Sequence, residues 1–313
     1  MKRVSLIASV ALVAALGGAA FADDPKFAFA KPEDVKPAVK DPNAVEWTAA
    51  AEAGLIFTTG NSETTTATGG LKASRKGGDN KLSIEASGAF AKSSIRTLDD
   101  KNGNGTIDNQ GEIVSVDSVT AEMLAGKLRY DRFLTDFNSL FVAALGARDL
   151  PAGKKAVFGG QLGYSRRLFK SKMTEAVGEF GYDFSRQELV TGGGNSIHSA
   201  RAFIGVKSTM TEGADMDASL EVLTNLNRET LKTTDDNGSV IDGGPFKDTR
   251  VNAHLGVAAK IGKNLAVSST IDLHYDNRPA PLTIKGGMLA MGFVPQASKM
   301  DTIMKASLIY TFF

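Results

Sequence analysis

The 313-residue sequence contains no cysteine. This absence excludes disulfide bonds and thiolate chemistry, and it leaves no residue to carry the lipid of a lipoprotein. An oxidising compartment is therefore permitted but is not required by the sequence.

Long apolar runs are also missing beyond the N-terminal region. Hydrophobic residues make up 42% of the chain and the mean hydropathy is −0.10, whereas a membrane-spanning helix needs about 20 consecutive apolar residues. A helical membrane protein is thereby excluded. Neither charge sign dominates, because 36 Lys and Arg face 35 Asp and Glu, so the net charge does not indicate a nucleic-acid partner.

What the chain does contain is a repeated alternation of apolar and polar residues. In Thr249–Ile261, for example, Val251 and Leu255 fall on one face and Arg250 and Asn252 on the other, as in a strand with lipid on one side and water on the other. About twelve such segments predict an all-β fold, a transmembrane antiparallel up-and-down β-barrel. The segments are 46–59, 62–76, 81–95, 119–133, 138–148, 156–168, 174–187, 199–207, 217–228, 249–261, 266–275 and 301–313.

The gaps between these segments alternate in length. Brief gaps such as Leu134–Phe137 have the length of periplasmic turns, while Arg96–Ser118, Thr230–Asp248 and Asn277–Met300 have the length of outer loops. This parity predicts that both chain ends lie in the periplasm of a Gram-negative bacterium.

The N-terminal region predicts export. Lys2 and Arg3 precede an apolar run, and Ala20-Phe21-Ala22 forms an A-x-A cleavage site. We therefore expect a signal peptide over residues 1–22, a proline-rich periplasmic linker over 23–45 and the barrel over 46–313.

The C-terminal segment also predicts a barrel. Ala306, Leu308, Tyr310 and Phe312 form an apolar row and Phe313 is the terminal aromatic residue. A final strand of this kind resembles those by which outer-membrane barrels are recognised by the barrel-assembly machinery, which we expect as a partner. The row is shifted by one residue from the usual register, in which the terminal aromatic residue belongs to it.

A family resemblance begins at Glu46-Trp47 and continues through Phe57-Thr58-Thr59-Gly60-Asn61-Ser62-Glu63-Thr64. This block resembles the opening hairpin of the outer-membrane family known as domain of unknown function 481, whose members are often named salt-induced outer membrane proteins. The resemblance covers Trp47 to about Lys76 and implies a barrel in the outer membrane. It implies no particular biochemical activity.

One predicted outer loop has the pattern of a calcium-binding loop. Oxygen-bearing side chains occupy loop positions one, three, five and nine, and Gly105 occupies position six. The expected position-twelve glutamate is displaced by one residue, and Asp, Asn and Gly also favour turns without any metal. The candidate Ca²⁺ ligands are Asp100, Asn102, Asn104, Thr106, Asp108 and Glu112. The stretch Asp235–Asp242 is a weaker version of the same pattern.

Three histidines bear on whether the barrel is an enzyme. His198 and the adjacent Ser199 point to opposite faces of a strand, and no Asn or Asp shares the face of the histidine at a spacing that would orient it, so we expect no catalytic site. His254 and His274 are expected to face the lumen as hydrogen-bonded polar residues rather than as a metal pair.

Charged residues of both signs are predicted to point into the lumen. Glu175, Glu179 and Asp183 share one strand face, so they would favour cations in an open channel and would pair with Arg129 and Arg201 in a closed one. The candidate lumen-facing residues are Glu85, Lys127, Arg129, Glu175, Glu179, Asp183, Arg201 and Arg250.

Two function classes follow from this pattern. The first is a structural or stress-related barrel of the envelope, whose loops bind divalent ions, lipopolysaccharide or protein partners. The second is a narrow diffusion channel for small solutes or ions. We expect contact with outer-membrane lipid in both cases and with nucleic acid in neither.

Overall fold

The computed structural model describes residues 45–58, 63–98, 113–229, 233–234, 240–241, 243–281 and 298–312. The predicted signal peptide, the linker up to residue 44 and Phe313 lie outside these residues. Among the described residues, no helix is long and apolar enough to cross a membrane.

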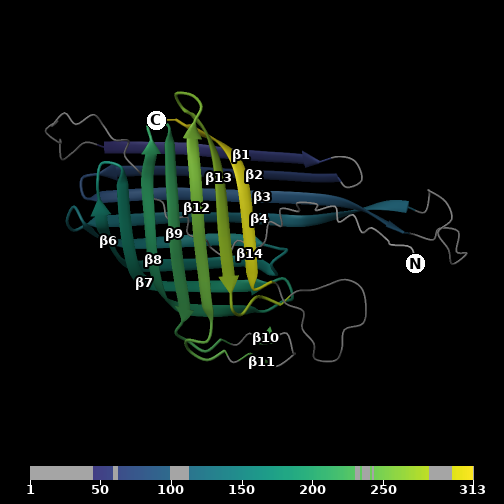
Figure 1. Ribbon diagram of the computed structural model, residues 1–313. Helices are drawn as coiled ribbons and strands as arrows, with labels where there is room; N and C mark the ends of the chain where they lie inside the picture. The colour runs from purple at the N-terminus through teal and green to yellow at the C-terminus, as the bar shows by residue number, and fades with distance from the viewer. Residues whose placement is uncertain are drawn as a thin grey trace, which may run out of the picture.

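Over these residues the chain forms a closed barrel of twelve antiparallel strands (Figure 1), which confirms the predicted fold. Two further strands, β10 (Thr233–Thr234) and β11 (Val240–Ile241), pair only with each other. The barrel strands are β1 (Val45–Thr58), β2 (Glu63–Gly77), β3 (Asn80–Leu98), β4 (Ile113–Phe133), β5 (Asn138–Asp149), β6 (Lys154–Lys170), β7 (Thr174–Leu189), β8 (Gly194–Thr211), β9 (Ala214–Asn225), β12 (Thr249–Lys260), β13 (Leu265–Asp276) and β14 (Met300–Thr311).

Each strand pairs with its neighbour in the chain, and β1 closes the barrel against β14. The closing register is short and runs from Ala50 opposite Thr311 to Ala53 opposite Leu308. By contrast, β1 pairs with β2 along its whole length, from Val45 opposite Gly77 to Thr58 opposite Thr64. The barrel is therefore closed by its shortest strand pairing.

The alternation of side chains sets which face meets lipid. On β5, Leu140 and Val142 are 49% and 53% exposed, while Phe141 between them is 4% exposed. On β14, Leu308 and Tyr310 are exposed whereas Ser307 is buried. The outer face is thus apolar and the inner face is mixed, as expected of strands with lipid on one side.

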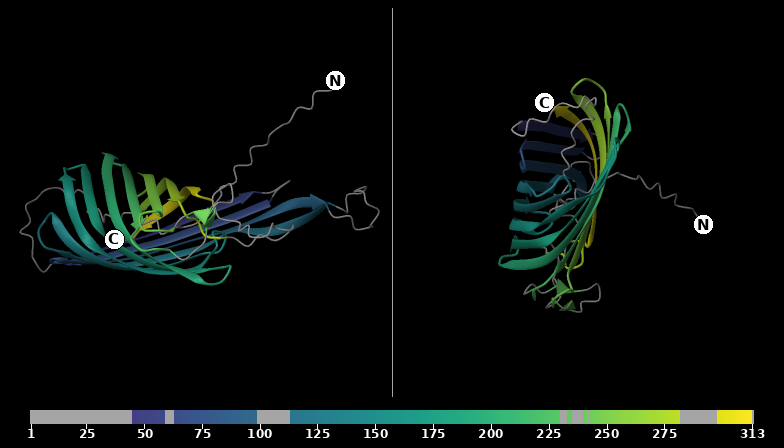
Figure 2. Two further views of the ribbon diagram at one scale, coloured as in Figure 1. Left: turned by 90° about the horizontal axis from the view of Figure 1, so that it is seen from below. Right: turned by 90° about the vertical axis from the view of Figure 1, so that its left-hand side faces the viewer.

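The barrel is flattened rather than round. Strands β1–β4 form one wall and β8, β9 and β12–β14 the opposite wall, and the strand directions of the two walls cross steeply (Figures 1 and 2). Ile303 of β14 packs against Ala91 of β3 and Ala121 of β4. Because these small side chains let the walls touch, the lumen is narrow.

One predicted loop is shorter than expected. The gap placed at Arg96–Ser118 is partly strand, because β3 continues to Leu98 and β4 begins at Ile113. The reason is visible in Ile113-Val114-Ser115-Val116, where apolar residues continue to recur in a strand-forming stretch. These two strands form a ribbon that extends beyond the rest of the barrel (Figure 1).

Candidate functional site in the barrel lumen

A network of ion pairs crosses the lumen at mid-height. Glu179 on β7 accepts hydrogen bonds from Arg129 on β4, with Nη2 and Oε1 2.7 Å apart, and from Arg201 on β8, with Nη1 and Oε2 2.8 Å apart. Arg129 also contacts Asp131 at 2.7 Å, and Arg201 Nε lies 2.5 Å from Glu221 on β9. We call these five residues the central network.

Aromatic rings and glycines create the space for these arginines. The guanidinium carbon of Arg129 lies 4.1 Å from the centre of the Phe141 ring, and that of Arg201 lies 5.2 Å from the Phe203 ring, both within cation–π range. A Cβ atom on Gly163 would come within 2.9 Å of the Phe141 ring. The glycine therefore lets Phe141 enter the lumen and support the central network.

Burial makes the central network dependent on all of its members. Arg201 and Glu221 are each 1% exposed, and Asn252 donates a hydrogen bond to the second oxygen of Glu221 at 2.8 Å. Removing one partner of a buried pair leaves an uncompensated charge, which costs about 3–5 kcal/mol. The network is therefore stable only when complete.

A second cluster surrounds His254 on β12. Its Nδ1 lies 2.5 Å from Asp272 on β13 and its Nε2 lies 2.7 Å from Asp217 on β9. Lys305 on β14 lies 3.1 Å from the other oxygen of Asp272. An ionised carboxylate only accepts hydrogen bonds, so each ring nitrogen can donate to the aspartate beside it. This arrangement joins four neighbouring strands and leaves neither nitrogen for a metal ion.

The described residues of the connection between β9 and β12 lie beside the ends of these two strands, at the end of the barrel that we call the mouth. Asn225 donates hydrogen bonds to the carbonyls of Asn227 and Gly244 at 2.8 and 2.9 Å. The backbone N–H of Glu229 donates to the carbonyl of Gly243 at 2.8 Å, and that of Asp248 donates to the side chain of Asn225 at 2.9 Å. These bonds hold the described parts of this connection against the strand ends.

Four charged side chains are buried in the mouth. Arg278 lies 3.6 Å from Glu229, and Arg250 lies 3.7 Å from Asp248. Burial, followed by the nearby charge of Asp276, raises the pKa of Asp248 to about 8. The carboxyl group of Asp248 therefore keeps its proton to a higher pH than an ordinary aspartate does.

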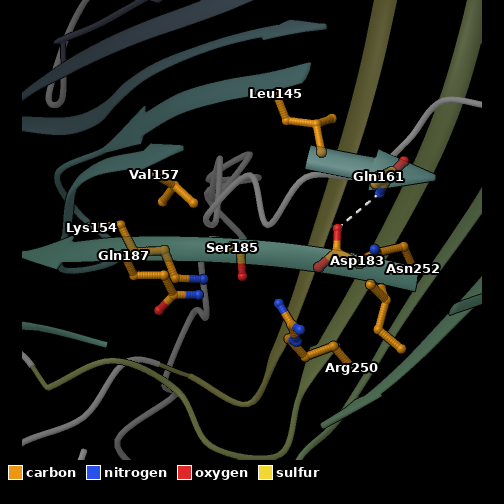
Figure 3. Close-up of a pocket in the computed structure, with 10 residues that line it drawn as sticks. Leu145, Lys154, Val157, Gln161, Asp183, Ser185, Gln187, Arg250 and Asn252 are labelled. Atoms are coloured by element: carbon orange, nitrogen blue, oxygen red, sulfur yellow. Dashed lines mark hydrogen bonds between the residues drawn. The ribbon is translucent and has the colours of Figure 1, made fainter. Parts of the chain in front are cut away.

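A small cavity lies beside Asp183, Ser185 and Arg250, which are among the residues that line it (Figure 3). It has a volume of about 30 Å³, which is room for roughly two water molecules. Three buried polar atoms on residues that line it have no hydrogen-bond partner: Gln161 Oε1, Ser185 Oγ and Arg250 Nε. Water is the simplest occupant that satisfies donors and acceptors together.

The predicted lumen-facing residues occupy several environments. The central network contains Arg129, Glu179 and Arg201, while Arg250 belongs to the mouth. Asp183 accepts a hydrogen bond from Gln161 at 3.1 Å, and Glu175 forms an ion pair with Arg167. Lys127 and Glu85 are opposite one another on β4 and β3 and are half-buried.

The sequence patterns did not identify Asp131, Glu229, Asp248 or Arg278 as site residues. Asp131 follows Arg129 by two positions, so period-two alternation places both on one face and could have identified it. Asp248 and Arg278 lie in connections predicted to be outer loops, and Glu229 immediately precedes one of them. The alternation of apolar and polar residues does not extend into these connections.

The candidate calcium ligands, Asp100 to Glu112, lie outside the described residues, as does Asp235–Asp242 apart from Val240 and Ile241. Within the part of the chain that is described, no group of three or more His, Cys, Asp or Glu side chains is arranged to hold a metal ion.

Comparison with known proteins identifies one family. The model of the family described as "Protein of unknown function, DUF481" matches residues 51–240, more than half of the chain. No curated protein sequence matches significantly.

Several solved structures are similar over most of the chain. The NanC porin has 8% identity and a TM-score of 0.43, covering 85% of this chain and 100% of that one. The translocator domain of autotransporter NalP from Neisseria meningitidis has 14% identity and a TM-score of 0.40, covering 86% and 88%. An anion-selective porin from Comamonas acidovorans has 10% identity and a TM-score of 0.35, covering 86% and 100%.

Proposed function

This chain belongs to the DUF481 family of proteins of unknown function, and we propose that it is a structural barrel of the bacterial outer membrane with a closed lumen. The central network carries the proposal. It runs from β4 through β7 and β8 to β9, and each of its five side chains contacts an oppositely charged one. A solute crossing at this height would have to separate buried ion pairs.

Contacts across the lumen between strands that are not neighbours support the same proposal. Lys154 on β6 lies 3.7 Å from Asp276 on β13, although β7, β8, β9 and β12 separate these strands around the barrel. Elsewhere in the lumen, Ile303 on β14 packs against Ala91 on β3 and Ala121 on β4. Side chains thus bridge the interior at several levels.

The rest of the proposed role concerns the orientation of the barrel in the membrane and what its loops and outer surface bind. We assign the long connections to the cell exterior and both termini to the periplasm, because the three long connections, β3–β4, β9–β12 and β13–β14, all lie at the same end of the barrel and every connection at the other end is a short turn. The connection between β3 and β4 would bind Ca²⁺ with the weak affinity of extracellular modules, about 10⁻⁴ to 10⁻³ M. Lipopolysaccharide and the barrel-assembly machinery are the proposed partners.

A narrow diffusion channel is the second candidate. Lys72 on β2 lies opposite Glu85 in the β2–β3 register and Ser87 lies opposite Gly70, all on inward-facing positions. Lys72 and Ser87 are nevertheless exposed. Water therefore reaches the lumen along this wall, and a path for small ions would follow it.

Conductance in a planar bilayer distinguishes the two functions. We expect the refolded chain to be silent at neutral pH and the double variant Arg129→Ala, Glu179→Ala to conduct, because it removes the ion pair that bridges β4 and β7. In this variant Arg201 keeps Glu221 as a partner, whereas Asp131 loses its ion pair with Arg129. The control is Arg148→Ala with Glu122→Ala, an exposed pair 3.0 Å apart. Steady conductance by the unmodified barrel would reject the closed lumen and establish the channel.

A further inference from the structure

One histidine in the lumen has a carboxyl group beside each of its two ring nitrogens. Nδ1 of His254 on β12 lies 2.5 Å from Asp272 Oδ1 on β13, and Nε2 lies 2.7 Å from Asp217 Oδ2 on β9. Both distances are short, as expected of hydrogen bonds between charged groups. His254 is directly opposite Asp272 in the strand register, and Asp217 is directly opposite Gly256. The register of three paired strands therefore brings these side chains together.

Gly256 leaves the room that this arrangement needs. A Cβ atom at this position would lie 2.9 Å from Asp217 Oδ1 and 3.0 Å from His254 Nε2. A larger residue would displace the aspartate or the ring, because such contacts are closer than van der Waals packing allows. The contact between Asp217 and His254 thus depends on a glycine between them.

The two carboxyl groups make the protonation state of the ring the central question. A neutral imidazole has one N–H donor and one acceptor nitrogen, whereas an imidazolium has two N–H donors. Only the imidazolium can donate to two ionised carboxylates at once. The alternative is a neutral ring with the proton on one aspartate, so the charges around the aspartates decide between the two states.

Cations beside both aspartates favour the ionised carboxylates. Lys305 on β14 lies 3.1 Å from Asp272 Oδ2. Lys207 on β8 is opposite Asp217 in the strand register and interacts with it electrostatically. The side chain of Asp217 is also 36% exposed, so it keeps part of its hydration, which favours the charged form. The proton therefore belongs on the ring.

Three further titratable groups lie near this cluster. Asp215 on β9 and Lys260 on β12 both interact with Lys207 and carry opposite charges. His274 on β13 lies near His254, and its Nδ1 is 3.0 Å from Asn252 Oδ1. These groups leave the balance of charge around the two aspartates unchanged.

From these contacts we infer that His254 is an imidazolium in the folded barrel at neutral pH and clasps β9, β12 and β13 together. Through Lys305 the clasp reaches β14, the strand that closes the barrel against β1. Raising the pH removes one of the two N–H donors, so the clasp weakens as the pH rises. The barrel thus has a pH-sensitive contact beside its closing strand. This inference goes beyond the proposed closed lumen and does not depend on it.

Nitrogen NMR of the refolded barrel, isotopically labelled at histidine, tests the proton. The chain has three histidines, and protonated and neutral ring nitrogens give distinct signals. At about pH 7 we expect one histidine with both ring nitrogens protonated, and this signal should be absent from His254→Gln and present in His198→Gln. His198 is the matched control because it contacts Tyr182 and Phe184.

Two NMR results would overturn the imidazolium. One is the absence of any doubly protonated histidine from the unmodified chain, which requires no variant to fold. The other is a doubly protonated signal that persists in His254→Gln, because the signal would then belong to another histidine.

Band-shift electrophoresis against temperature tests the clasp. At about pH 6 we expect the unmodified chain to lose its folded band about 5 °C above His254→Gln, and at about pH 9 we expect less than half that difference. Comparing variants at one pH cancels the general effect of pH on the barrel. The same difference at both pH values would reject the clasp, whereas steady conductance at neutral pH would reject the closed lumen and leave this result standing.

Discussion

Single residues in the lumen act through shared partners rather than alone. Alternation along a strand predicts that Arg129 and Glu179 point inward, but they are 50 positions apart in the chain, and no local pattern specifies which arginine meets which carboxylate. The faces of the strands were therefore predictable from the sequence, while the pairing within the central network was not. Pairing depends on which strands lie opposite across a flattened lumen.

Arg201 gives the sharpest residue-level prediction. Arg201→Ala leaves Glu221 and Glu179 buried with fewer cationic partners, so we expect the free energy of unfolding to fall by about 3–5 kcal/mol. Urea titration in lipid vesicles, followed by circular dichroism, measures this loss. The exposed Arg148→Ala should cost less than about 1 kcal/mol, and equal losses from the two variants would contradict a cooperative buried network.

Strands differ in how well their limits follow from the sequence. The pattern placed β5 and β7 within two residues of their observed ends, because polar turns flank them. It began β4 at Val119 rather than Ile113 and β8 at Ser199 rather than Gly194. In both cases pairing with the neighbouring strand continues beyond the stretch where the apolar and polar faces are cleanly separated.

At the scale of the strand, we can predict the effect of a substitution on the pairing of β1 with β14, which closes the barrel. A Cβ atom on Gly54 would lie 2.5 Å from Thr68 Oγ1 and 3.0 Å from the carbonyl of Ala306. We therefore expect Gly54→Ala to strain the closing pairing and to lower stability by about 1–3 kcal/mol.

Band-shift electrophoresis against temperature detects this weakening of the folded barrel. Gly146→Ala is the control, because nothing lies within 4 Å of the Cβ it adds. If both variants lose the folded band at the same temperature as the unmodified chain, crowding at Gly54 does not limit closure.

At the scale of the whole molecule, the number and order of the strands followed from the sequence, whereas the shape of the barrel did not. Periodicity and gap lengths specify an up-and-down barrel of about twelve strands. They do not specify that small side chains such as Ala91 and Ala121 allow one wall to approach the other. Whether the lumen is open or closed is therefore a property of the assembled barrel.

Contact between the walls can be tested with a disulfide, because the chain has no cysteine of its own. We expect Ala91→Cys with Ile303→Cys to crosslink on oxidation, since these side chains pack together in the lumen. The crosslink would be seen as altered mobility after denaturation. Leu124→Cys with Ile303→Cys is the control, because Leu124 points outward and is 63% exposed; crosslinking of that pair instead would refute the flattened arrangement.

Flattening separates the perimeter of the barrel from the width of its bore, two quantities that are linked in a round barrel. Strand number fixes the perimeter of the barrel, and the perimeter fixes how many lipid molecules surround it, whereas the bore depends on how far apart the walls stand. A flattened barrel of twelve strands thus carries the lipid belt of a round barrel with the same strand number around a narrower bore. The strands of its two broad walls also run in different directions within the bilayer. A neighbouring molecule therefore contacts a different surface at a broad wall than at a narrow edge.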